Sequence, residues 1–195
     1  MLPMQAFKIC THIWAAWFAI WLIWALQSKR TQESEGVASL FSYAIPVWVS
    51  ILLIAFPRSL GPLGRTEILP PGTPLAITAI AITVLGFALT LWARYILGSN
   101  WSSTVTIKVD HQLIRTGPYR HVRHPIYTGL IIAMIGTIIA LDEWRGVPAV
   151  FFLWLGFTIK RLKEEQFMHQ TFGDRYTDYA RTAGAIFPTL LRRGN

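Results

Sequence analysis

The chain has 195 residues, of which 53% are hydrophobic and nine are tryptophan, and it carries a formal net charge of +8. Apolar runs close to the ~20 residues that cross a bilayer recur along it, which excludes one or two ordinary soluble domains. The positive charge does not indicate nucleic-acid binding. Blocks rich in Lys and Arg are absent, and the basic residues stand at the ends of the apolar runs.

The first apolar run, residues 6–26, predicts a membrane helix rather than a cleaved signal peptide. Its core "IWAAWFAIWLIWAL" is long and aromatic, and the "QSKRTQ" after it offers no small-residue cleavage site. Cys10 in this run cannot form an internal disulfide because it is the single cysteine, and we expect it to be a buried, inert thiol. We expect the tryptophans mostly to face lipid or headgroups.

Four further apolar runs follow, at residues 40–56, 74–97, 125–141 and 147–159. Lipid cannot satisfy exposed backbone groups, so each run must be helical, and the alternation typical of a membrane barrel is absent. Only "DEWRG" joins the last two runs, which predicts an antiparallel hairpin. The fold class is therefore all-α, a polytopic membrane protein with about five transmembrane helices, the fifth continuing out of the bilayer past Lys160. We expect three N-terminal transmembrane helices in residues 1–97 and a core with the hairpin and a C-terminal cytoplasmic helix in residues 98–195.

The charges of the connecting segments predict the orientation. Lys and Arg are concentrated between residues 98 and 124 and from residue 160 onward. The positive-inside rule then places the N-terminus outside and both of these segments in the cytoplasm, as in a bacterial or archaeal inner membrane. We expect the two segments to fold together and to carry the chemistry.

The start of the fourth run has the features of an anion site. Pro125 is tolerated at the first helical position, which places His124 at the N-cap beside unpaired backbone N–H groups. Such a helix start attracts anions such as a carboxylate. Gly129 leaves room for a close approach to the backbone, and Gly136 repeats the small-residue face, for which helix packing is the alternative interpretation.

Charged residues also gather where the fifth run ends. Lys160 and Glu164 are four residues apart and share a helix face, with Arg161 and Glu165 one position on. A solvated ion pair is the commonest cause of this spacing. At the membrane surface, however, such groups are candidates to line a cavity that opens toward lipid.

Other site classes lack their motifs. His121 and His124 have no carboxylate or cysteine set at metal-ligand spacing, so no metal is predicted. The sequence has no Gly-x-Gly-x-x-Gly after a predicted strand and no Gly-x-Ser-x-Gly elbow.

Three stretches, "NWSSTVTIKVDHQLIRTGPY", "RHVRHPIYTG" and "KRLKEEQFMHQTFGDRYTDYARTAGAIFP", together resemble the isoprenylcysteine carboxyl methyltransferase family of integral-membrane methyltransferases. The resemblance runs from about residue 98 to residue 188. It implies S-adenosyl-L-methionine as methyl donor, S-adenosyl-L-homocysteine as product, and a site under the cytoplasmic loops instead of a Rossmann sheet. The cofactor-binding residues that it implies are His111, Gln112, Leu113, Ile114, Gly117, Tyr119, His124, Pro125, Ile126, Tyr127 and Glu165.

The resemblance also implies the acceptor side of the reaction, with Lys160, Arg161 and Glu164 as catalytic residues. Eukaryotic members carry an arginine and a glutamate four residues apart at the substrate carboxylate. Here Lys160 stands for the arginine, and an ammonium cannot clamp a carboxylate bidentately. The implied acceptor is the carboxylate of an isoprenylcysteine-like or other amphiphilic lipid that enters from the bilayer, with no nucleic acid and no obligate protein partner.

Three alternatives stay open on the sequence alone. A phospholipid or amine N-methyltransferase and a thiol S-methyltransferase would use the same donor on another nucleophile. A non-catalytic membrane component would require the charges around His124 and Glu164 to be merely topological.

Overall fold

The computed structural model describes residues 3–26, 31–56, 60–62, 66–69, 72–108 and 112–189. Within them the chain forms α1 (Pro3–Ala25), α2 (Val37–Ala55), α3 (Thr73–Leu97), α4 (Pro125–Leu141), α5 (Gly146–Phe172) and α6 (Asp174–Thr182). Two short 3-10 helices, η2 (Gly98–Asn100) and η3 (Gly117–Arg120), and an antiparallel pair of short strands, β1 (Thr31–Ser34) and β2 (Thr106–Lys108), connect them. The all-α class is confirmed, and the two-stranded sheet was not anticipated.

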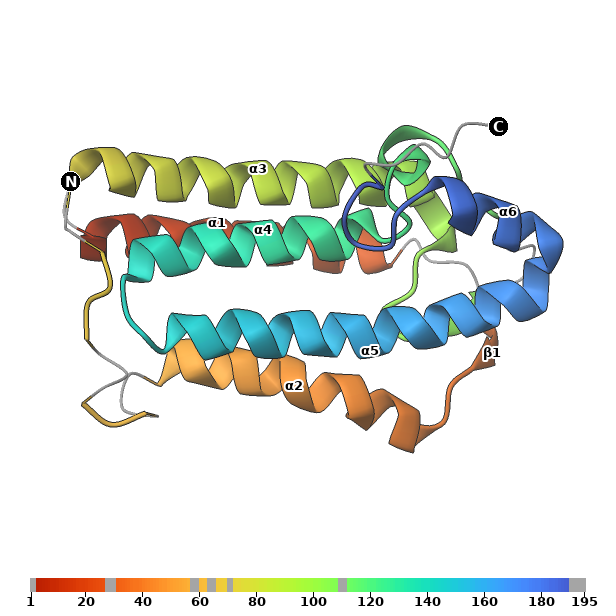
Figure 1. Ribbon diagram of the computed structural model, residues 1–195, viewed down its shortest axis with the longest axis horizontal. Helices are drawn as coiled ribbons and strands as arrows, with labels where there is room; N and C mark the ends of the chain where they lie inside the picture. The colour runs from red at the N-terminus through yellow and green to blue at the C-terminus, as the bar shows by residue number, and fades with distance from the viewer. Residues whose placement is uncertain are drawn as a thin grey trace.

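The five long helices run side by side along the long axis of the molecule (Figure 1). Helix α3 packs on α4, α1 packs against both, and α2 packs on α5. The strand β1, the helix α6 and the C-terminal segment lie at one end of the bundle, and the chain starts at the other. Both segments expected in the cytoplasm therefore meet at a single end.

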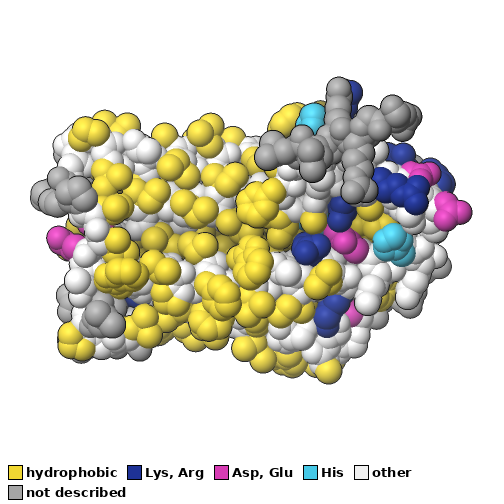
Figure 2. Space-filling model, in the orientation of Figure 1, with side chains coloured by type: hydrophobic (Ala, Val, Ile, Leu, Met, Phe, Trp, Pro, Cys, Tyr) yellow, Lys and Arg dark blue, Asp and Glu magenta, His cyan; other side chains and the backbone are white. Residues whose placement is uncertain are grey.

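The surface and the helix lengths are those of a multi-pass integral membrane protein. Hydrophobic side chains cover the middle of the visible face, and most of the charged ones gather at the end that carries α6 (Figure 2). Helices α1, α2 and α3 are long and apolar enough to cross a membrane, whereas α4 is apolar but has only 17 residues. Helix α5 begins apolar and becomes charged from Lys160. Three spans are thus identified by length and composition, and the total of five stays a prediction.

Glycines bring α3 and α4 into backbone contact. A Cβ on Gly129 would lie 2.5 Å from the Gly86 carbonyl oxygen, and one on Gly136 would lie 2.5 Å from Thr83 Oγ1. Contacts this short are impossible, so both positions need a residue without a side chain. The group that approaches Gly129 is the α3 backbone, and Gly136 serves helix packing as well.

Three tryptophans of α1 face into the bundle, although the tryptophans were expected mostly to face lipid or headgroups. The Trp17 indole donates a 2.7 Å hydrogen bond to Thr90 on α3, and Trp14 donates one of 2.9 Å to Thr137 on α4. Trp21 stacks on Trp17. The expectation was wrong here because threonine hydroxyls inside the bundle satisfy the indole N–H groups, which lets α1 bury its rings. Cys10 is buried, as predicted.

The hairpin of α4 and α5 turns at Asp142, which adopts a left-handed conformation with φ of 54°. Its carboxylate accepts hydrogen bonds from the amides of Ile68 and Leu69, at 3.1 and 2.8 Å. Arg145 donates to the Leu53 carbonyl at the end of α2. The antiparallel hairpin is confirmed, and these bonds fasten the loop before α3 and the end of α2 to it.

Candidate functional site

Helix α5 carries the acidic residues of the candidate site. It runs without a break from its apolar half into "KRLKEEQFMHQTF", so two successive turns present the charges on one side. The Lys160 ammonium lies 3.9 Å from the Glu164 carboxylate, and the Arg161 guanidinium lies 3.6 Å from the Glu165 carboxylate. The side chains of both glutamates are largely buried, with exposed fractions of 23% and 15%.

His124 at the start of α4 joins the two glutamates. Its Nδ1 lies 3.3 Å from Glu164 Oε2, and its Nε2 lies 3.1 Å from Glu165 Oε1. One turn on, the Tyr127 hydroxyl donates a 2.7 Å hydrogen bond to Glu164 Oε1. The start of α4 and the charged half of α5 are therefore in direct contact.

Arg123 is a third partner of the Glu165 carboxylate, after Arg161 and His124. Its Nη2 and Nε lie 3.0 and 3.3 Å from Glu165 Oε1, and its Nη1 donates to the carbonyls of Ala180 and Ala183. Its backbone N–H donates to the Gly184 carbonyl at 2.7 Å. This one residue thus connects the end of α6, the segment after it, and α5. In the sequence, Arg123 is one of the basic residues between positions 98 and 124, which indicated only the orientation in the membrane.

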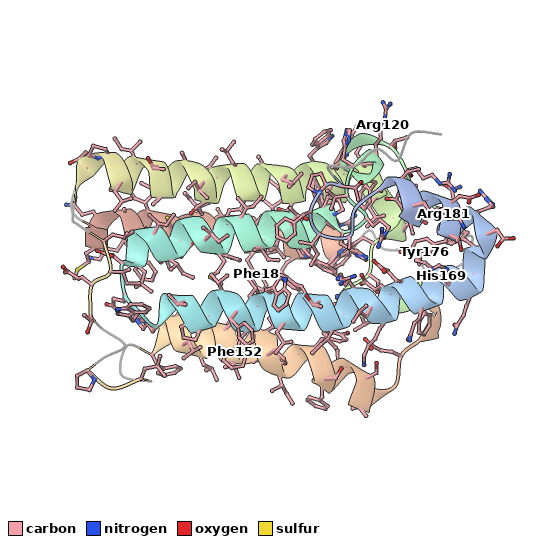
Figure 3. The ribbon with its side chains drawn as sticks, viewed as in Figure 1. Phe18, Arg120, Phe152, His169, Tyr176 and Arg181 are labelled. Carbon is pink, nitrogen blue, oxygen red and sulfur yellow. The ribbon has the colours of Figure 1, made fainter. Side chains whose placement is uncertain are left out.

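The segment after α6 is bonded along the start of α4. The backbone N–H of His124 donates to the Ala185 carbonyl at 3.0 Å, and the Thr128 hydroxyl donates to the Ile186 carbonyl at 2.5 Å. The rings of His169 on α5 and Tyr176 on α6 lie edge to face with their centroids 4.7 Å apart (Figure 3). These contacts hold α6 over the charged cluster.

Opposite charges shift the pKa values of this cluster. Burial alone would lower the pKa of His124, but its hydrogen bonds to Glu164 and Glu165 outweigh burial and raise it. Burial would likewise raise the pKa of Glu165, yet the hydrogen bond from His124 and the charges of His124 and Arg123 lower it to about 2. The pKa of Glu164 also falls, because the bond to His124 and the Lys160 charge outweigh burial. At neutral pH the glutamates are ionised and the imidazole retains its proton more readily than a free histidine.

The raised pKa of His124 predicts a pH-dependent stability. A group whose pKa is raised by folding stabilises the protein fully below its unfolded pKa, about 6.5, and loses this contribution as the pH rises through the folded pKa. We expect His124→Gln to cost about 2 kcal/mol at pH 6 and progressively less toward pH 9. Melting temperatures in detergent across this range measure the difference. His121→Gln is the control, because His121 is exposed. If the stability loss in His124→Gln does not change with pH, His124 is not held in its protonated form.

Residues of the N-terminal half that no sequence motif had indicated lie beside the charged part of α5. The Tyr43 hydroxyl donates to the carboxylate of Glu35, which also accepts hydrogen bonds from Ser39 Oγ at 2.6 Å and from the Val105 amide at 3.0 Å. Lys163 on α5 donates to Ser39 Oγ at 2.6 Å. Glu35, Ser39 and Tyr43 follow one another at four-residue intervals, but their contacts with Val105 and Lys163 join segments that lie far apart in the chain.

The residues that the resemblance assigned to the cofactor lie in several environments. Ile114, Tyr119, Ile126 and Tyr127 belong to one apolar cluster with Ala93 of α3. Leu113 packs under α6 instead, with Tyr176 and Tyr179. Gly117, with φ of +58°, opens η3 against Ile96, and Pro125 is fully buried. Gln112 is exposed, and His111 lies outside the described residues.

The structure thus brings His124, Tyr127, Lys160, Glu164 and Glu165 together, while Leu113 packs with the tyrosines of α6 and Gln112 is exposed. In the ranges that the structure describes, no group of His, Cys, Asp or Glu could hold a metal ion. Both ring nitrogens of His124 are already engaged with carboxylates.

The sequence model of the isoprenylcysteine carboxyl methyltransferase (ICMT) family matches residues 79–170, from the middle of α3 into α5. A protein-S-isoprenylcysteine O-methyltransferase of Saccharomyces cerevisiae is 32% identical over 118 residues, which are 55% of this chain and 49% of the yeast protein. The Homo sapiens protein of the same name is 32% identical over 121 residues, 60% of this chain and 43% of its own. A probable one from Oryza sativa subsp. indica is 28% identical over 60% of this chain and 62% of its own.

A solved structure, that of the eukaryotic intramembrane Ras methyltransferase ICMT, matches with a TM-score of 0.57 and 26% identity. The match covers 80% of this chain and 54% of that one. The chain therefore spans roughly half the length of the relatives that it matches. Residues 79–170, which include His124, Tyr127 and the two glutamates, are thus similar to the isoprenylcysteine carboxyl methyltransferase family.

Proposed function

We propose that the protein is an S-adenosyl-L-methionine-dependent integral-membrane methyltransferase that acts on the carboxylate of an isoprenylcysteine-like or other amphiphilic acceptor. The observation that carries the proposal is the direct contact of Glu164 on α5 with His124 and Tyr127 on α4. Both sides of this contact lie in the family segment, residues 79–170. The relatives named protein-S-isoprenylcysteine O-methyltransferase support the type of reaction. Residues 98–195 would form its catalytic core.

The residues at the start of α4 fit a donor that carries both an anion and a cation. The amides of Ile126 and Tyr127 are in the first turn, where a helix has no backbone acceptors for them, so they can hold a carboxylate. Because the His124 ring is engaged with two glutamates, its contribution would be to fix this helix start. The Tyr119 ring, in the same apolar cluster as Ile126 and Tyr127, would favour a positively charged group nearby. S-adenosyl-L-methionine, when bound, supplies an electrophilic methyl group on a cationic sulfur.

The acceptor side needs alignment more than a base. A carboxylate is already ionised at neutral pH, so the site has to orient it and exclude water. The Lys160 ammonium has three donors, of which one is used by the Ser103 carbonyl at 2.6 Å. Lys160 and Arg161 would orient the acceptor anion, and Glu164 would hold the Lys160 ammonium in place.

The orientation in the membrane is part of the proposal. The two segments rich in Lys and Arg meet at one end of the bundle, opposite the start of the chain (Figure 1). This supports a cytoplasmic site and an outside N-terminus. The acceptor would reach the site from the bilayer.

Two substitutions test the assignment. We expect Lys160→Ala and Glu164→Ala each to lower methyl transfer by at least about tenfold, as loss of a charged contact to the acceptor would, with S-adenosylhomocysteine binding kept within about threefold. Labelled donor with prenylcysteine analogues, and separately with phosphatidylethanolamine, measures the activity and identifies the acceptor class. Arg181→Ala is the control, because the Arg181 guanidinium is exposed and pairs with the equally exposed Asp178. Full activity in both variants would refute the assignment.

A further inference from the structure

The ammonium of Lys160 is surrounded by two aromatic rings, a carbonyl and a carboxylate, which are groups that bind cations. Its Nζ lies 5.4 Å from the centroid of the Tyr43 ring and 5.6 Å from that of Tyr127, both within cation–π range. The Ser103 carbonyl accepts its hydrogen bond at 2.6 Å, and Glu164 lies 3.9 Å away. We call these four groups, the Tyr43 and Tyr127 rings, the Ser103 carbonyl and the Glu164 carboxylate, the cation box.

The walls of the cation box are held by contacts that do not involve Lys160. The Tyr43 hydroxyl donates to Glu35, and the Tyr127 hydroxyl donates to Glu164. The Tyr127 ring stacks on His124 and on Phe157, with centroid distances of 5.4 and 4.7 Å. The box is therefore expected to keep its shape when the lysine is shortened.

We propose that the cation box is a binding site for an organic ammonium group, that the chain fills it with its own Lys160, and that this tethered cation excludes acceptors that end in an ammonium. A second cation would have to displace Lys160 or lie beside it in a poorly solvated site, where repulsion between like charges is strong. An anionic acceptor meets the opposite situation, since the ammonium attracts it. The choice among acceptors rests on the proposed function, whereas the box itself does not.

Shortening Lys160 tests the box directly. Lys160→Ala removes three carbons and the ammonium, which are the heavy atoms of n-propylammonium, whereas Lys160→Met removes the charge but keeps most of the bulk. Calorimetry in detergent at constant ionic strength would compare n-propylammonium with the neutral 1-propanol. We expect n-propylammonium to bind Lys160→Ala at least about tenfold more tightly than the wild type or Lys160→Met, and more tightly than 1-propanol. Adding Tyr43→Leu should weaken this binding by about two- to thirtyfold.

If Lys160→Ala and Lys160→Met bind n-propylammonium equally tightly, the cation box is refuted. It is also refuted if Lys160→Ala binds n-propylammonium and 1-propanol equally tightly. A second measurement needs only the wild type: binding of two prenyl thioethers that differ in ending with a carboxylate or with a primary ammonium. We expect at least a tenfold preference for the carboxylate, and equal binding would overturn the exclusion even if Lys160→Ala does not fold. Because all these readouts are binding constants, a protein that binds as expected and transfers no methyl group would refute the proposed function alone.

Discussion

Gly86→Ala is expected to separate α3 from α4 and to lower the free energy of unfolding by about 2 kcal/mol or more. A Cβ on Gly86 would lie 2.5 Å from the Gly129 carbonyl oxygen and 2.8 Å from the Ala133 Cα. These are backbone atoms, which cannot rotate away as a flexible side chain could. The two helices must move apart, and the neighbouring contacts are lost with them.

Titration with a denaturing detergent, followed by circular dichroism, measures this loss. Gly36→Ala is the matched control, because Gly36 has an ordinary φ of −71° and a Cβ there would meet nothing within 4 Å. We expect the control to lower the stability by about 1 kcal/mol at most, because Gly36 is the N-cap of α2 and alanine is a poorer cap than glycine. A Gly86→Ala protein as stable as the control would show that α3 and α4 are less closely packed than described.

The helices themselves were predictable from the sequence, because an apolar run in lipid has helix as its only open structure. The predicted run 125–141 has the same bounds as α4. Apart from the hairpin of α4 and α5, which helices pair was not predictable, since runs that are apolar on every side carry no periodic signal of the buried face. The pairing of α2 with α5 shows why. It depends on Gly156, where a Cβ would lie 2.9 Å from the Tyr43 carbonyl oxygen.

The candidate site was predictable only where its residues are close in sequence. The four-residue spacing of Lys160 and Glu164 and the position of His124 before Pro125 each indicated a local arrangement. Glu35 and Tyr43 gave no such signal, because they reach the site through the packing of α2 on α5. One turn after Gly156, this close packing places the Tyr43 ring beside the Lys160 ammonium.

Glu165→Ala is expected to be the most destabilising change in the polar end of the molecule, at about 3 kcal/mol or more. Glu165 lies against three cationic groups, those of Arg123, His124 and Arg161, at 3.0 to 3.6 Å. Removing its carboxylate leaves these positive charges together in a largely buried place, which costs more than the loss of one attraction. Asp178→Ala is the control, because the Asp178–Arg181 pair is exposed and such pairs contribute about 1 kcal/mol at most.

The pH dependence of this effect identifies the charge of Glu165 as its cause. Folding lowers the pKa of Glu165 from about 4.5 to about 2, so its contribution is complete above pH 4.5 and is lost as the pH falls toward 2. The stability difference between the wild type and Glu165→Ala should therefore be largest from pH 5 to 6.5, where the partner His124 is also charged, and should shrink below pH 4. Melting temperatures in detergent at pH 3, 4 and 6 measure it. A difference that does not change with pH would mean that packing around Glu165, and not its charge, stabilises the meeting of α4, α5 and α6.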